Sequence, residues 1–314
     1  MRHFIEPNSF SLAEQLALLE LAERMERNPA PYAHLCDGRI LATLFYEPST
    51  RTRLSFESAM LRLGGKTLGF AGAQLSSASK GETVADTARV VSNYADLIAM
   101  RHPMEGAPLR ASQYARVPVI NAGDGGHAHP SQTMIDLMTI RQRKGRLDHL
   151  TVGFCGDLKF GRTVHSLVAA LSQFEGNQFV FISPEELRIP QYVKDETLLP
   201  LHQSYRETAD LEQELPALDV LYMTRVQQER FLNEEEYLRL KGCYTLNKAL
   251  LRSARPDMPV LHPLPRIDEI DPEIDDDPRA AYFDQVHNGV YIRMAIILAL
   301  LNIPDPLTGT TVLN

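Results

Sequence analysis

The chain has 314 residues, of which 44% are hydrophobic and 23% are charged, and its formal net charge is −8. This length and composition allow two buried cores of about 150 residues each, so we expect a globular protein of two domains. The negative net charge excludes binding to nucleic acid or to an anionic membrane through general basicity, so any anion site must be built locally.

The cysteine and hydrophobic patterns exclude further classes of protein. Cys36, Cys155 and Cys243 are widely spaced, without a CxxC or paired Cys/His pattern, which indicates neither a disulfide framework nor a zinc site. The first residues lack the apolar core of a signal peptide. The longest apolar run, residues 294–301, is shorter than the roughly 20 residues that span a bilayer. We therefore expect a cytoplasmic protein.

The N-terminal half alternates helical and strand-like segments. Ser11 and Glu14 form the pattern of a capping box, which predicts a helix that extends to about Arg27. Apolar runs then predict strands at residues 40–45, 67–70, 97–100 and 117–120, separated by amphipathic helical patterns such as residues 83–94. This alternation is typical of a parallel sheet covered by helices.

The same pattern restarts after a long helix predicted at residues 131–143. Strand-like runs lie at residues 151–155, 179–182, 220–223 and 260–261, and the apolar helix near residues 290–301 is predicted to be buried. Residues 183–217 and 265–281 are rich in Pro, Glu and Asp and are predicted to be surface connections. The predicted fold is α/β, with two doubly wound parallel-sheet domains, helices on both faces of each sheet, and interdomain helices.

The segment EPSTRTRLSFE at residues 47–57 carries the clearest chemical signal. A strand, a turn and a helix predicted to begin near Ser49 would gather backbone N–H groups, hydroxyls and guanidinium groups around one point, which suits an oxyanion such as phosphate. The alternative is an ordinary N-capped helix with solvated arginines, since Ser and Thr begin many helices. The segment alone favours the anion site without excluding this alternative.

Polar residues also follow the other predicted strands. In doubly wound sheets the ligand lies at the carboxyl ends of the strands. Six of these ends carry Arg, His, Gln or Pro-rich turns, at residues 49–53, 101–103, 121–132, 156–163, 224–227 and 262–265. Four of the six contain arginine. A chain of negative net charge has thus concentrated cations where a ligand would bind.

Seven motifs, in order, resemble those of the catalytic chains of the aspartate carbamoyltransferase family. They are STRTR at 49–53, SKGET at 79–83, MRHP at 100–103, NAGDG and HPSQ between 121 and 132, GDLKFGRTVHSL at 156–167, TRVQQER at 224–230 and HPLP at 262–265. Ser131 stands where the family usually has Thr, and residues 76–79 are richer in Ser than the family pattern. The resemblance implies a carbamoyl-phosphate-binding domain of residues 1–131 and 288–314, and an aspartate-binding domain of residues 132–287.

The resemblance also implies a reaction and a set of site residues. The carbamoyl group of carbamoyl phosphate would pass to the amine of L-aspartate, giving N-carbamoyl-L-aspartate and phosphate in de novo pyrimidine biosynthesis, without a metal or other cofactor. The implied catalytic residues are Arg51, Thr52, Arg101 and His129. Carbamoyl phosphate would be bound by these four and by Ser49, Thr50, Gln132, Leu264 and Pro265, with Ser76 and Lys80 from a neighbouring subunit. Aspartate would be bound by Lys80, Arg162, Thr163, Arg225 and Gln227.

Two alternatives remain beside this interpretation. Ornithine and related amino-acid carbamoyltransferases share the STRTR type of motif, but Arg162 and Arg225 suit the two carboxylates of aspartate better than the side-chain ammonium of ornithine. A non-catalytic homologue would have lost catalytic groups that this chain retains. The resemblance implies a homotrimer, and no motif decides whether regulatory chains or a dihydroorotase bind it.

Several polar or reactive residues have simpler structural explanations. We expect hydrogen-bonded structural histidines, turn-forming aspartates and a core cysteine at His102, His165, His262, Asp124, Asp157 and Cys155. Glu47 is different, because a carboxylate beside a phosphate site is unfavourable unless it is paired. We expect Glu47 to engage an arginine such as Arg162 or Arg230.

Overall fold

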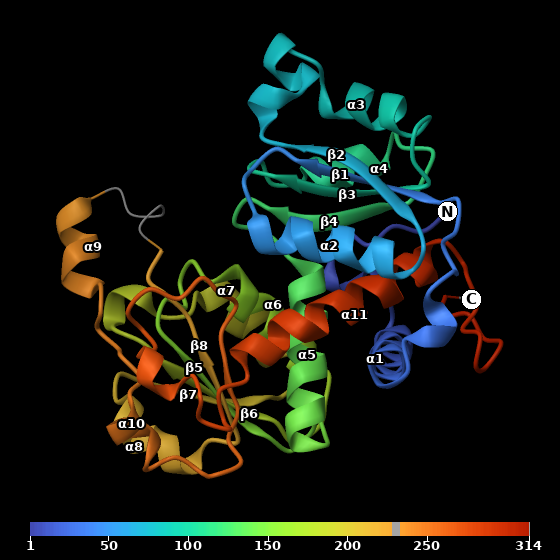
Figure 1. Ribbon diagram of the computed structural model, residues 1–314. Helices are drawn as coiled ribbons and strands as arrows, with labels where there is room; N and C mark the ends of the chain where they lie inside the picture. The colour runs from blue at the N-terminus through green and yellow to red at the C-terminus, as the bar shows by residue number, and fades with distance from the viewer. Residues whose placement is uncertain (228–232, 314) are drawn as a thin grey trace. The chain divides into compact units, whose positions relative to one another are not determined.

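The computed structural model describes residues 1–227 and 233–313 and divides into two compact units (Figure 1). Unit 1 comprises Met1–Ile135 and Val286–Asn314, and unit 2 comprises Asp136–Gln285. The two boundaries fall inside helices α5 (Pro130–Lys144) and α11 (Tyr282–Leu300). Each unit contains its own parallel β-sheet.

The sheet of unit 1 has four parallel strands in the order β2, β1, β3, β4. Alternate residues point to opposite faces of a strand. Ala42 and Leu44 of β1 pack in one apolar cluster with Ala88 of α3 and Ala111 of α4, whereas Thr43 donates a hydrogen bond of 3.0 Å to Glu57 of α2. Helices therefore cover both faces. The elements are α1 (Leu12–Arg27), β1 (Ile40–Phe45), α2 (Thr50–Arg62), β2 (Lys66–Ala71), α3 (Val84–Val91), β3 (Leu97–His102), α4 (Ala107–Ser112) and β4 (Val119–Asp124).

The sheet of unit 2 has five parallel strands in the order β7, β6, β5, β8, β9. One face carries a cluster of aromatic rings, in which Phe154 lies 5.7 Å from Tyr222 and 6.0 Å from Phe181 between ring centroids. The opposite face carries aliphatic residues and Cys155, which is fully buried as expected. The elements are β5 (Thr151–Cys155), α6 (Arg162–Leu171), β6 (Gln178–Ile182), α7 (Gln191–Val193), β7 (Ser204–Thr208), α8 (Leu211–Glu214), β8 (Val220–Met223), α9 (Glu234–Leu240), α10 (Lys248–Leu251) and β9 (Val260–Leu261).

The predicted α/β class with two parallel sheets is confirmed, and each of the eight predicted strands overlaps an observed strand. Strand β7 was missed, because it lies in the 183–217 segment that we expected to be a surface connection. Its sequence, SYRET, forms an edge strand whose first four residues are exposed, so it contains no apolar run. The expectation for residues 265–281 was also partly wrong, because Ile270 and Ile274 are fully buried in the core of unit 2.

Helix termini and helix burial agree with the sequence at several points. Ser11 and Glu14 form the predicted capping box of α1. The apolar C-terminal helix is α11, and Ile292 and Ile296 are among its fully buried residues, as predicted. Among the described residues, no helix is both long enough and apolar enough to cross a membrane.

The strand order reverses direction once in each sheet. In unit 1, β2 lies on one side of β1 and β3 lies on the other. In unit 2, β6 and β7 lie on one side of β5, and β8 and β9 lie on the other. The loops after β1 and β3, and after β5 and β8, therefore leave the sheet in opposite directions, and in folds of this type ligands bind at the carboxyl ends of these strands.

Gly156 permits the close approach of the loops that follow β5 and β8. Its φ is +117°, and a Cβ atom there would lie 2.2 Å from the backbone oxygen of Thr224. Gly145, also in unit 2, has a φ of +72° with open space around it. Both glycines have a positive φ, but a side chain would meet a steric clash only at Gly156.

We predict that Gly156→Ala destabilises the protein by ~2 kcal/mol more than Gly145→Ala, because the second change meets only the ~1 kcal/mol penalty of the left-handed backbone. Urea unfolding followed by circular dichroism measures both variants. Equal losses of stability in the two variants would contradict the steric explanation.

Candidate active site

The ends of β1 and β3 lie side by side at the switch point of unit 1, the place where the strand order reverses. The backbone N–H of Tyr46, just after β1, donates to the backbone oxygen of Arg101 in β3 at 2.9 Å. This contact places the residues around Ser49 beside those around Arg101. The parallel register, in which Phe45 is the partner of Arg101, has the same consequence.

The N-terminus of α2 follows directly on the turn after β1. Ser49 is the N-cap residue, but its side chain makes no capping hydrogen bond, so the alternative of an ordinary N-capped helix does not describe it. Thr50 and Arg51 are exposed, and Thr52 is buried. A helix N-terminus with exposed donor side chains is suited to bind an anion.

His129 and Thr52 lie together in unit 1, although 77 positions separate them. The His129 Nε2 atom and the Thr52 Oγ1 atom are 3.4 Å apart, and both residues are buried. The backbone N–H of Gln132 donates to the His129 oxygen at 2.9 Å in the first turn of α5. The two sequence motifs STRTR and HPSQ therefore contribute to one group of side chains.

Arg101 is held by a carboxylate that the sequence analysis did not connect with it. Its Nη2 atom donates to Glu47 at 2.6 Å, and its Nη1 atom donates to the Ala122 oxygen at 3.4 Å. Its buried Nε atom has no hydrogen-bond partner among the described residues. Glu47 thus has an arginine partner that we did not name. Arg230, which we did name, lies outside the described residues.

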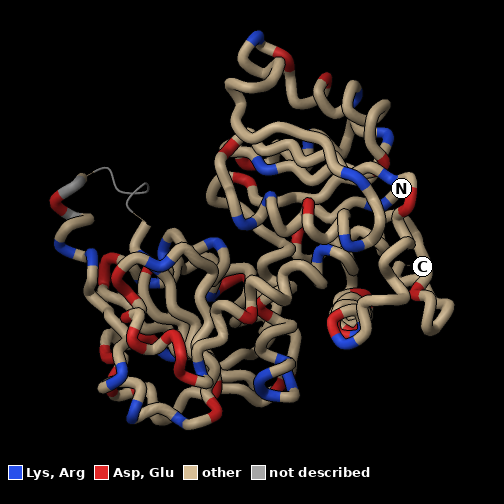
Figure 2. Tube along the Cα trace, viewed as in Figure 1, with Lys and Arg blue, Asp and Glu red and all other residues tan. Residues whose placement is uncertain are grey.

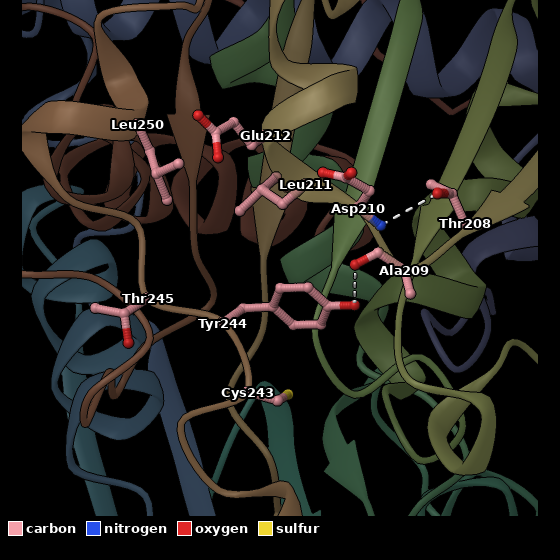
Figure 3. Close-up of a pocket in the computed structure, with 9 residues that line it drawn as sticks. All are labelled: Thr208, Ala209, Asp210, Leu211, Glu212, Cys243, Tyr244, Thr245 and Leu250. Atoms are coloured by element: carbon pink, nitrogen blue, oxygen red, sulfur yellow. Dashed lines mark hydrogen bonds between the residues drawn. The ribbon is translucent and has the colours of Figure 1, made fainter.

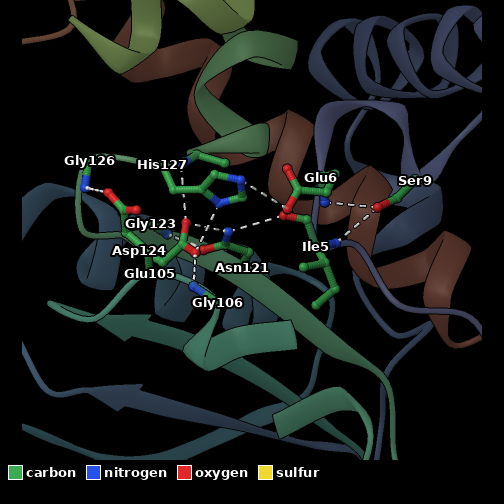
Figure 4. A network of polar contacts seen from close by, with 11 residues as sticks. Ile5, Glu6, Ser9, Glu105, Gly106, Asn121, Gly123, Asp124, Gly126 and His127 are labelled. Atoms are coloured by element: carbon green, nitrogen blue, oxygen red, sulfur yellow. Dashed lines mark hydrogen bonds and ion pairs between the residues drawn. The ribbon is translucent and has the colours of Figure 1, made fainter. Parts of the chain in front are cut away.

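The carboxylate of Asp124 organises the turn that leads to His129 (Figure 4). It is 1% exposed and accepts hydrogen bonds from the backbone N–H groups of Gly106 at 2.9 Å and Ala128 at 3.1 Å. The Asn121 amide donates to it at 2.9 Å, and His127 lies 3.2 Å away. The expected turn-forming role is confirmed, and the carboxylate additionally links β4 to the turn before α4.

Ser76 and Lys80 lie in the loop between β2 and α3. The Ser76 hydroxyl donates to the Ala73 oxygen at 2.8 Å and accepts from the Ala78 N–H at 3.3 Å. Lys80 is exposed at the end of a short 3-10 helix, Ser77–Lys80. The expected action of this loop in a neighbouring subunit stays a prediction.

Unit 2 contributes a second group of polar residues at its own switch point. Arg162 and Thr163 begin α6 after β5, and Arg225 and Gln227 follow β8; all four are half-buried. The side-chain amide of Gln227 donates to the Phe160 oxygen at 3.1 Å. The loop with Gln227 is therefore attached to the loop that leads to Arg162.

Asp157 stabilises the two loops that carry Arg162 and Gln227. It is fully buried and accepts hydrogen bonds from the backbone N–H groups of Phe160 at 3.0 Å and Gln227 at 3.3 Å. Burial raises the pKa of Asp157, and the two N–H groups oppose this effect. Asp157 shapes a turn, as expected, and it also joins the two loops, which the sequence pattern did not reveal.

The expected structural histidines are confirmed. The fully buried His262 accepts the Leu264 N–H at Nδ1 at 2.8 Å, and its Nε2 lies 2.6 Å from Glu269. Burial lowers the pKa of His262, and Glu269 opposes that shift. His165 donates to the Leu158 oxygen at 2.7 Å, and His102 accepts the Met104 N–H at 2.9 Å. Leu264 and Pro265 follow His262 and are joined by a cis peptide bond.

A separate hollow of about 480 Å³ lies in unit 2, after β7 (Figure 3). The Tyr244 hydroxyl donates to the Ala209 oxygen at 2.9 Å within it. The residues that line this hollow include none of the expected site residues. Figure 2 shows acidic and basic residues distributed over both units.

Comparison with known proteins connects both switch points to one family. The family description "Aspartate/ornithine carbamoyltransferase, carbamoyl-P binding domain" matches residues 2–142. Its counterpart, "Asp/Orn binding domain", matches residues 148–300. The two matches together cover most of the chain.

Individual relatives extend this similarity over nearly the whole length. The chain is 61% identical to the aspartate carbamoyltransferase catalytic subunit of Lachnoclostridium phytofermentans, over 96% of this chain and 99% of that one. The catalytic subunit of M. jannaschii aspartate transcarbamoylase matches with a TM-score of 0.89 and 46% identity, over 96% of this chain and 98% of that one. The Trypanosoma cruzi aspartate transcarbamoylase in complex with carbamoyl phosphate and aspartate matches with a TM-score of 0.88 and 38% identity, over 94% of this chain and 95% of that one. The chain belongs to the aspartate/ornithine carbamoyltransferase family.

Proposed function

We propose that this protein is an aspartate carbamoyltransferase. It transfers the carbamoyl group of carbamoyl phosphate to the amine of L-aspartate, giving N-carbamoyl-L-aspartate and phosphate, as a step of de novo pyrimidine biosynthesis. The observation that carries the choice of aspartate is the pair Arg162 and Arg225 at the switch point of unit 2. Guanidinium groups bind carboxylates in planar, bidentate pairs, and aspartate offers two carboxylates.

The groups of unit 1 suit the phosphate of the first substrate. Ser49, Thr50, Arg51 and Thr52 lie at the start of α2, where backbone N–H groups and the helix dipole favour negative charge. Arg101 is already oriented by Glu47. We assign it to the phosphate and to the carbonyl oxygen of the carbamoyl group. Phosphate is a competent leaving group when its charge is compensated in this way.

His129 and Thr52 are assigned to the carbonyl oxygen of the carbamoyl group. Negative charge develops on this oxygen when the aspartate amine attacks the carbamoyl carbon. A buried donor that faces the developing charge typically lowers the barrier by about 3 kcal/mol, and both residues are buried and adjacent. Gln132, with the backbone oxygens of Leu264 and Pro265, is assigned to the carbamoyl NH₂ group.

The groups of unit 2 are assigned to aspartate. Arg162 with Thr163 binds the α-carboxylate, and Arg225 with Gln227 binds the β-carboxylate. The hydrogen bonds of Asp157 to the two loops hold these side chains in place before the substrate arrives. Positioning of two bound reactants can itself supply several kcal/mol, so the reaction needs no covalent intermediate.

The working unit is assigned as a homotrimer in the cytoplasm. Lys80 is exposed on a loop of unit 1, as a residue that acts in a neighbouring subunit must be. In this assembly Ser76 contributes to the phosphate site of the neighbour, and Lys80 contributes to both substrate sites.

We predict that the purified protein releases phosphate from carbamoyl phosphate when aspartate is supplied and not when ornithine is supplied. Phosphate release and carbamoyl-amino-acid formation, measured in parallel, give the result. Activity with ornithine would indicate the related enzyme class. Binding of carbamoyl phosphate without turnover of either amino acid would indicate a non-catalytic homologue.

We predict that Arg225→Ala raises the KM for aspartate by about 10- to 100-fold, because a charge-assisted hydrogen bond is worth roughly 1.5–3 kcal/mol. The dissociation constant of carbamoyl phosphate should change little, and steady-state kinetics with equilibrium binding measure both. Arg239→Ala is a matched control, because Arg239 is an exposed arginine of unit 2 that pairs with Glu186. Equal losses for the two substrates would argue against the assigned role of Arg225.

We predict that inactive Lys80→Ala chains and inactive Arg51→Ala chains regain activity when they are unfolded together and refolded as mixed trimers. Random mixing leaves one intact site in each mixed trimer, so the expected activity is about a quarter of the wild-type value. A mixture of Arg51→Ala and Thr52→Ala chains is the control, because both changes lie in the same half of each site and cannot complement one another. If native mass spectrometry detects mixed trimers that remain inactive, the shared site is disproved.

A further inference from the structure

Arg293 is a buried cation in the C-terminal helix of unit 1. It lies in α11 with 4% of its surface exposed, and no acidic side chain among the described residues forms an ion pair with it. Burial lowers the pKa of its guanidinium to about 9, so the group still carries its charge at neutral pH. Burying a charge without a partner of opposite charge costs folding free energy.

The surroundings hold the guanidinium in one place. Its Nη1 atom donates to the Gly289 oxygen at 3.0 Å, one turn earlier in α11, and its carbon lies 4.9 Å from the centre of the Phe56 ring. A Cβ atom on Gly289 would lie 2.6 Å from Nη1. The glycine therefore leaves the space in which the side chain folds back along its own helix.

The remaining contact of the guanidinium leads to His129. The Nη2 atom lies 3.5 Å from the Ser131 hydroxyl oxygen, which in turn lies 3.4 Å from His129 Nδ1. Both distances are at the long end of hydrogen bonding, as is common for site residues before a substrate binds. Ser131 is fully buried, so water does not compete for either contact.

The donors and acceptors along this chain of contacts can be assigned from their chemistry. Arginine has only donors, so the Ser131 oxygen accepts from Arg293 and keeps its own proton to donate. The facing atom is His129 Nδ1, which must then be the acceptor. In a neutral imidazole the proton is therefore on Nε2, the atom that faces Thr52 at 3.4 Å.

We propose that Arg293 and Ser131 are positioning residues that hold His129 as its Nε2–H tautomer. The guanidinium orients the serine hydroxyl, the hydroxyl donates to Nδ1, and Nε2–H is left to donate to the carbonyl oxygen of carbamoyl phosphate. The catalytic consequence rests on the proposed function, whereas the tautomer itself does not.

The tautomer is measured directly by ¹⁵N NMR of the full-length protein labelled with [¹⁵N]histidine, without substrate. The His129 signals are assigned by comparison with His129→Gln. In the wild type, we expect a protonated Nε2 and an unprotonated Nδ1. Ser131→Ala should shift His129 toward a mixture of both tautomers, and Ser131→Thr, which restores the hydroxyl, should retain the wild-type pattern.

Ser55→Ala is the matched control. The Ser55 hydroxyl is also buried in unit 1 but has no hydrogen-bond partner among residues 1–227 and 233–313, so its removal should leave the His129 signals unchanged. Arg293→Met keeps the packing against Phe56 and removes the donor to Ser131, so it should reproduce the Ser131→Ala pattern. Thermal unfolding shows whether each variant is folded.

The kinetic expectation is a loss in kcat of about tenfold or more for Ser131→Ala and Arg293→Met, because the donor to the developing charge is present only part of the time. The KM for carbamoyl phosphate should change little, and Ser131→Thr should restore kcat. A wild-type His129 with its proton on Nδ1, or unchanged signals in folded Ser131→Ala, would overturn the proposal. A wild type that shows the expected tautomer but forms no carbamoyl aspartate would instead overturn the proposed function.

Discussion

Parallel pairing of β1 with β3, and of β5 with β8, is the constraint on which the candidate sites depend. Neighbouring parallel strands end at the same edge of the sheet, and a reversal of strand order makes the two following loops diverge. The backbone contact from Tyr46 to Arg101 in unit 1 has a counterpart in unit 2, where the Thr224 N–H donates to the Cys155 oxygen at 2.8 Å. A backbone contact thus joins the ends of two neighbouring central strands in each unit.

The buried carboxylates explain how these loops keep their conformation. Asp124 and Asp157 accept backbone N–H groups from residues that are distant in sequence or lie in the next loop. A loop that leaves the sheet exposes N–H groups without strand partners, and a buried carboxylate can satisfy several of them at once. Each aspartate therefore fixes a backbone path, and the side chains assigned to the substrates are carried on that path.

The cations of this acidic chain occur in two different environments. Arg101 is paired with Glu47 at the carboxyl end of β3. Arg293 is buried beside an aromatic ring and a serine hydroxyl. The first arrangement orients a charge at the end of β3, and the second places a charge in contact with Ser131, through which we propose that it positions His129.

The sequence by itself determined the fold class, most strands and the types of residue at the strand ends, because apolar periodicity and turn residues are local properties of the chain. Motif order also supplied the family, and structural roles were expected for His102, His165 and His262. Strand β7 was missed because an exposed edge strand carries no apolar run. The partners of Glu47, Asp157 and Arg293 were decided only by the tertiary structure, because hydrogen bonds between residues tens of positions apart depend on strand order, register and side-chain direction.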